Sequence, residues 1–169
     1  MTYPPLLWAS ELTGFPGAPF EDALVEAAGE RVRDECGWHI APVVSETVTV
    51  DIRESGRAVL PTLRLVNVTA VRDVSGSSPV TLPLSAWRWR RSGILECGTW
   101  SRGRRTLEVD ISHGYDRCPP ALLDSVAQRL RSGSGAVLRE QVGDVSVSYS
   151  GGVSSAAGAA SKYVLAGIA

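Results

Sequence analysis

The 169-residue sequence has few of the residues that most often carry chemistry. It holds two histidines, three cysteines and one methionine, and Lys162 is the only lysine among 17 basic residues. No stretch approaches the ~20 consecutive apolar residues that a membrane-spanning helix needs. Residues 1–10 also lack the basic start and apolar core of a signal peptide. We therefore expect a soluble chain, made in the cytoplasm, with no membrane as a partner.

The cysteines argue against a disulfide framework and against a metal centre. Cys36, Cys97 and Cys118 are odd in number and lack CxxC spacing, which is typical of reduced thiols. Two loose pairs of metal-ligand type exist, Cys36 with His39 and His113 with Cys118. A zinc site usually presents two tight pairs of ligands. Core and capping roles are the simpler interpretation, so we expect no metal.

The sequence also lacks a recognisable active site. It contains neither a GxxxxGK[ST] loop nor a GxGxxG loop after a strand, so phosphate-binding loops are absent. The Ser132–Gly135 stretch follows a predicted helix, whereas a nucleophile elbow follows a strand. A small hydrolase centred on His113 is a third functional interpretation, but no partner side chains assemble around it. We expect no enzymatic activity, no catalytic residues and no cofactor.

Hydrophobic periodicity predicts an α+β fold in which helices flank an antiparallel β meander. Helical spacing covers about residues 19–36, with the apolar stripe Phe20, Leu24, Ala27, Ala28, Val32 and Cys36, and again about 119–132. Between them, apolar and polar residues alternate as in half-buried strands. The strand segments are 44–52, 58–60, 67–74, 87–90, 94–97 and 107–111, with turns at 54–57, 75–79 and 92–93. Gly29 inside the first helix predicts a close contact there.

Both ends of the chain differ from this body. Residues 1–18 form an irregular arm whose Leu6, Leu7 and Trp8 need burial, on this chain or on a neighbour. Residues 19–132 form the α+β body, and residues 133–169 an extended tail. The tail carries a short strand at 145–149 and an Ala-rich segment at 154–166, too weak to fold as a helix alone. A tail of this kind predicts a docking segment, with contact residues Val145, Val147, Tyr149, Tyr163, Val164 and Leu165.

Arginine and tryptophan alternate in one part of the predicted sheet. The basic cluster comprises Arg88, Arg90, Arg91, Arg102, Arg104 and Arg105, interleaved with Trp87, Trp89 and Trp100. Strand alternation places Trp87 and Trp89 on one face and Arg88 and Arg90 on the other. The favoured interpretation is a core face opposite a solvated or subunit-facing one, in which the arginines meet a neighbouring subunit or line a DNA passage. The alternative is a single-stranded nucleic-acid-binding module, with bases stacked on the tryptophans.

The order of segments resembles the head-to-tail connector, or adaptor, proteins of long-tailed phages and prophages of actinobacteria. The resemblance covers about residues 20–150. It rests on CGWHIAP at 36–42, ETVTVD at 46–51, LPTL at 60–63, VNVTAV at 66–71, ISHGYD at 111–116, PPALL at 119–123 and VLREQVGDVSVSY at 137–149. An arginine-rich, lysine-poor composition fits a GC-rich genome of that kind.

The resemblance implies a structural protein in the virion neck, assembled in the host cytoplasm. Such adaptors form a ring, usually a dodecamer, beneath the portal protein. A stopper or tail-completion protein binds on the far side, and genome DNA passes through the channel without sequence-specific binding. The C-terminal tail of these adaptors typically reaches onto the portal. A heterologous ring requires two different surfaces on each subunit, and the arm, the Arg/Trp strands and the tail are the candidates.

Overall fold

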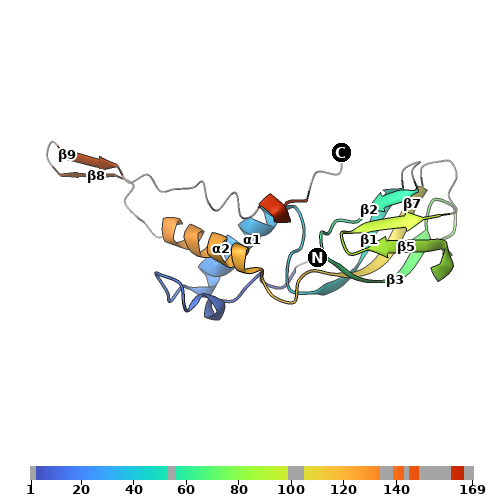
Figure 1. The fold of residues 1–169 in the computed structure, drawn as a ribbon, viewed down its shortest axis with the longest axis horizontal. Helices are drawn as coiled ribbons and strands as arrows, with labels where there is room; N and C mark the ends of the chain where they lie inside the picture. Colours follow the sequence, from blue (N-terminus) through green and yellow to red (C-terminus); the bar gives the residue numbers. More distant parts are fainter. Residues whose placement is uncertain are drawn as a thin grey trace. The chain divides into compact units, whose positions relative to one another are not determined.

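The computed structural model describes residues 3–52, 56–98, 105–133, 139–142, 145–148 and 161–165, and the chain forms two compact units (Figure 1). Unit 1 comprises residues 1–36 with 118–164, and unit 2 comprises residues 37–117 with 165–169. The elements in chain order are η1 Ala9–Leu12, α1 Asp22–Cys36, β1 Val44–Ile52, β2 Arg57–Val59, β3 Leu65–Asp73, β4 Val80–Thr81, η2 Leu84–Ala86, β5 Trp87–Arg90, β6 Ile94–Cys97, β7 Arg105–His113, α2 Pro120–Gly133, β8 Arg139–Val142, β9 Val145–Ser148 and η3 Ser161–Tyr163. None of the described helices is long and apolar enough to cross a membrane.

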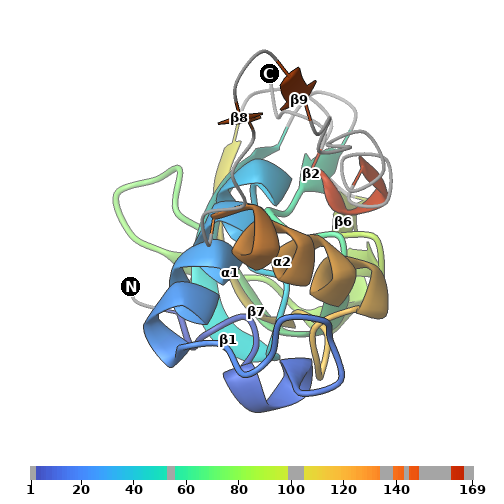
Figure 2. The same ribbon diagram turned by 90° about the vertical axis from the view of Figure 1, so that its left-hand side faces the viewer.

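Unit 1 is a pair of packed helices, α1 and α2, which lie side by side in Figure 2. The apolar face predicted for the second helix is confirmed, since Leu122, Val126 and Leu130 are buried. The face predicted for the first helix is partly wrong. Leu24 is 52% exposed, and Val25 is buried instead. The helix begins at Asp22, three residues later than predicted, and its buried stripe runs through Val25, Ala28, Val32 and Cys36.

The N-terminal arm packs on its own helix. Leu6 and Leu7 are buried, whereas Trp8 is exposed. A Cβ added to Gly29 would lie 3.2 Å from Leu6 Cβ, so the close contact expected at this glycine is confirmed. Arg33 is also buried and donates hydrogen bonds of 2.5 Å to the Pro4 carbonyl and to Glu30 Oε1. Burial of Leu6 and Leu7 therefore needs no neighbouring molecule.

Unit 2 contains two antiparallel sheets. Sheet A has the order β1-β7-β3-β4, and sheet B has the order β2-β6-β5. The strands between two helices confirm the α+β class. Consecutive strands pair as in a meander at β3–β4 and β5–β6, but β1 and β2 do not pair with each other. β1 pairs instead with β7, from Val44 opposite His113 to Ile52 opposite Arg105.

The two sheets share one hydrophobic core. Its buried residues come from both sheets and the segments between them: Ile52, Ala58, Leu60, Leu65, Val68, Val71, Trp87, Leu95, Cys97, Leu107, Val109 and Ile111. Because successive side chains in a strand point to opposite faces, the residues between these core positions project from the outer face of each sheet. The outer faces of sheets A and B therefore lie on opposite sides of unit 2.

The described part of the tail contains a two-stranded hairpin, β8–β9, which pairs with no other strand in the described part of the chain. The predicted strand at 145–149 is confirmed for Val145–Ser148, and β8 was not predicted. Of the Ala-rich segment, the structure describes only the single 3-10 turn η3 and the two residues that follow it. The rest of that segment lies outside the described residues.

Candidate functional site

The Arg/Trp strand β5 has the two-faced arrangement that its sequence predicts. Trp87 is buried and Trp89 is half-buried against the core, whereas Arg88 and Arg90 are exposed. Trp87 is only 6% exposed, so it cannot stack on a nucleic-acid base as the alternative interpretation requires. The exposed half of the strand is purely cationic.

Three arginines surround one carboxylate on the outer face of sheet B. The strand register places Glu96 directly between Arg57 and Arg88. Glu96 Oε1 lies 3.2 Å from Arg57 Nε and 3.1 Å from Arg90 Nη2. Sequence reasoning missed Arg57 and Glu96, because their place beside β5 depends on the pairing of β2 with β6. This face, with Arg57, Arg88, Arg90 and Glu96, carries an excess of two positive charges; we call it the basic face.

The remaining arginines of the predicted cluster do not join the basic face as one group. Arg91 is exposed in the turn after β5. Arg105 begins β7 in the other sheet, where it forms an ion pair with Asp73; its role as a channel or inter-subunit residue stays a prediction. Proximity in sequence does not bring these arginines together, since β5 and β7 belong to different sheets. Arg102, Arg104 and Trp100 lie outside the described residues.

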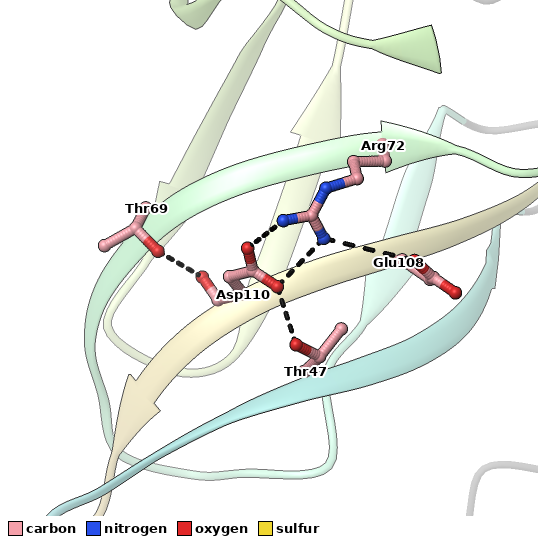
Figure 3. A network of polar contacts seen from close by, with 5 residues as sticks. All are labelled: Thr47, Thr69, Arg72, Glu108 and Asp110. Atoms are coloured by element: carbon pink, nitrogen blue, oxygen red, sulfur yellow. Dashed lines mark hydrogen bonds and ion pairs between the residues drawn. The ribbon is translucent and has the colours of Figure 1, made fainter. Parts of the chain in front are cut away.

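A polar network covers the outer face of sheet A (Figure 3). Arg72 donates to both carboxylate oxygens of Asp110, and Thr47 donates a 2.7 Å hydrogen bond to Asp110 Oδ1. Glu108 lies 4.0 Å from Arg72. The hydrogen bond from Arg72, followed by that from Thr47, lowers the pKa of Asp110 below its ordinary value. Asp110 is therefore held in its charged form in this network.

The outer face of sheet A carries negative charge. Besides Glu108 and Asp110 it presents Asp51, which accepts a 2.8 Å hydrogen bond from Thr106. Among the described residues of this face, three carboxylates and one guanidinium, that of Arg72, leave an excess of two negative charges. The rest of the face is built from serine and threonine, such as Ser45 and Ser112, whose hydroxyls lie 2.7 Å apart. We call this surface, with Asp51, Arg72, Glu108 and Asp110, the acidic face.

The predicted tail contacts are only partly described. The backbones of Val145 and Val147 lie in β9, and Tyr149 lies outside the described residues. Tyr163 ends η3, with Lys162 Nζ 4.9 Å from the centre of its ring. Val164 is 44% exposed, and Leu165 follows it. The docking role of these residues stays a prediction.

The two histidines lie together in unit 2, but the structure gives them hydrogen-bonding roles. Their rings meet edge to face with centroids 5.7 Å apart. His39 Nε2 lies 2.5 Å from the Pro42 carbonyl oxygen, and His113 Nε2 lies 2.8 Å from Glu46 Oε1. Among the described residues no group of three His, Cys, Asp or Glu side chains could hold a metal ion. Burial raises the pKa of the Cys118 thiol to about 12, so that group stays protonated.

We expect the free energy of unfolding to fall as the pH drops below about 6.5, the ordinary pKa of histidine. Burial lowers the pKa of His113 in the folded protein, against the opposing effect of Glu46. Between the unfolded and folded pKa values only the unfolded chain gains a proton, so stability present above pH 6.5 is lost on acidification. The slope contributed by this one group is at most about 1.4 kcal/mol per pH unit.

Urea unfolding followed by tryptophan fluorescence from pH 7.5 to 5.0 measures this slope. In His113→Gln the pH dependence becomes shallower than in the wild type, whatever the stability of the variant at pH 7.5. Equal slopes for the two proteins would contradict the assignment to His113.

No family model matches the chain, and no curated protein matches its sequence. Solved structures do match, and three of them cover most of this chain. A chain in the neck of an empty GTA particle, computed with C6 symmetry, gives a TM-score of 0.60 at 17% identity, covering 97% of this chain and 92% of that chain. A chain in the neck of a native GTA particle, computed with C12 symmetry, gives a TM-score of 0.55 at 15% identity, covering 87% of this chain and 82% of that chain. A chain in the virion of a native gene transfer agent (GTA) particle gives a TM-score of 0.58 at 17% identity, covering 97% of this chain and 92% of that chain.

This chain shares its fold with chains of gene transfer agent particles. The agreement extends over most of the length of both partners in each comparison. At such low sequence identity the agreement concerns the fold, which the hydrophobic pattern of the chain independently predicts as α+β.

Proposed function

We propose that this chain is a structural protein of a virion neck. Its role is that of a head-to-tail adaptor, a ring beneath the portal that joins capsid to tail and lets DNA pass. The observation that carries the proposal is the fold match to chains of two GTA neck structures, over 97% and 87% of this sequence. The segment order of the sequence points to the same kind of protein by a separate route.

Two observations support the proposed ring. The two neck structures were computed with C6 and C12 symmetry, and rings of identical subunits require two different contact surfaces on each subunit. The basic and acidic faces of unit 2 are two such surfaces. By this proposal the chain assembles into a dodecamer, with its own copies as the first partners.

The other partners of the proposed adaptor are the portal protein, a stopper or tail-completion protein, and genome DNA in the channel. The tail supplies the portal contact, because its hairpin lacks further strand partners in the described part of the chain. DNA passes without sequence readout. The arginine-rich composition favours a phage or prophage of an actinobacterium, with assembly in the host cytoplasm and residence in the virion neck.

Electron microscopy of this protein mixed with a portal protein from the same genome tests the proposal. We expect a ring of this chain on one end of the portal, with unit 2 recognisable as two packed sheets. A chain located in the capsid shell or the tail tube, or one that never binds the portal, would contradict the adaptor role.

A further inference from the structure

We propose that the basic face of sheet B in one copy of the chain docks on the acidic face of sheet A in the next copy. This inference rests on the proposed ring and names the surfaces that build it. Both faces belong to unit 2, so the contact can be argued from that unit alone.

The two faces project from opposite sides of one core. In β7, Leu107, Val109 and Ile111 point into the core, so Glu108 and Asp110 point out of sheet A. In β6, Leu95 and Cys97 point into the same core, so Glu96 and its surrounding arginines point out of sheet B. The faces of one unit therefore cannot meet each other. Each copy can offer one face to each of two neighbours.

The charges of the two faces match in magnitude and differ in sign. The basic face has three guanidinium groups and one carboxylate, and the acidic face has three carboxylates and one guanidinium. The key side chains reach solvent: Arg57 is 61% exposed, Arg90 60% and Glu108 41%. Complementary potentials of this kind select the partner and its orientation. A contact between opposite faces is heterologous, which is the type that generates a ring when its rotation closes.

A second copy fits the basic face better than nucleic acid does. A carboxylate, Glu96, stands at the centre of the face and repels phosphate, whereas the next copy's acidic face brings Arg72 as a positive counterpart. Trp87 is buried and Trp89 is half-buried, so the two tryptophans of β5 present little aromatic surface on which bases could stack. Nucleic-acid binding would also leave the acidic face unexplained.

Two variants test the contact, each with the charge of one face reversed. Arg88→Glu with Arg90→Glu makes both faces acidic, and Asp51→Lys with Glu108→Lys makes both faces basic. By sedimentation of the full chain at low ionic strength, we expect wild-type self-association that salt weakens, because screening acts on exposed charges. Each variant alone associates at least tenfold more weakly. An equimolar mixture of the two associates again, since each contact between unlike variants pairs an acidic with a basic face.

A control variant, Glu26→Arg with Arg31→Glu, reverses one charge of each sign on exposed positions of α1 and should associate as the wild type does. Circular dichroism checks that all variants are folded. Wild-type protein that stays monomeric, variants that associate normally, or a mixture that fails to associate would each overturn the contact. Oligonucleotide binding lost in Arg88→Glu with Arg90→Glu, without rescue by mixing, would favour nucleic acid instead. If microscopy shows a ring on the portal while the reversals change nothing, the face contact fails and the adaptor role stands.

Discussion

Replacing Gly93 by alanine should destabilise unit 2 by at least about 3 kcal/mol, the range of severe single substitutions. Gly93 has a φ of +80°, and a Cβ built there would lie 2.1 Å from the Thr62 carbonyl oxygen. This oxygen belongs to the backbone, so it cannot rotate away as the end of a side chain could. Leu60 also donates a 2.8 Å hydrogen bond to the Gly93 carbonyl, which fixes the two segments against each other. The left-handed conformation alone costs an alanine about 1–2 kcal/mol.

Gly98→Ala is the matched control for this substitution. A Cβ at Gly98 would meet no atom within 4 Å, and its φ is not in the left-handed region. We expect that variant to lie within about 0.5 kcal/mol of the wild type, as surface substitutions usually do. Urea unfolding monitored by tryptophan fluorescence compares the two variants. Equal midpoints would show that the turn at Gly93 can relax away from Thr62.

Removing residues 136–169 should abolish attachment to the portal while leaving the body folded. The truncation takes away the β8–β9 hairpin, and a lone two-stranded hairpin is marginally stable in water. It also removes η3, a single turn of three residues. Segments that cannot order themselves gain their order on a partner, and the ordering cost is then met by that contact. The loss of attachment should therefore be close to complete.

Phage carrying the truncated gene should accumulate filled or empty heads without tails, counted by electron microscopy. Circular dichroism and thermal unfolding of the purified truncated protein separate a docking defect from a folding defect. Normal joining of heads to tails by the truncated chain would exclude a docking role for residues 136–169.

Local patterns predicted most elements, because side-chain alternation is set within a strand. The apolar alternation at Val48 and Val50 placed β1, and the turn residues Ser92-Gly93 placed the β5–β6 hairpin. Local patterns could not predict which strands pair when the strands lie far apart in the sequence. The paired residues of β1 and β7 lie 53 to 69 positions apart in the sequence, from Ile52 with Arg105 to Val44 with His113, so no tight turn fixes that register.

In the candidate site, too, local patterns predicted some residues, and pairing between distant strands brings in the others. Alternation alone put Arg88 and Arg90 on the outer side of Trp87. Their neighbours Arg57 and Glu96 come from strands whose pairing is not local, so they escaped notice. Arg105 was grouped by sequence distance and lies in the other sheet. The acidic face was not predicted, because Asp51 joins Glu108 and Asp110 only when β1 pairs with β7.

Unit 1 is assembled from chain segments on either side of unit 2, and this has a consequence for synthesis on the ribosome. Helix α1 emerges early, but α2 follows only after all strands of both sheets have been made. Because synthesis adds about 5–20 residues per second, several seconds pass between the synthesis of α1 and that of α2. The residues that precede it are already available, and Leu6 and Leu7 pack at Gly29. We therefore expect the arm to cover part of the apolar side of α1 before α2 is made.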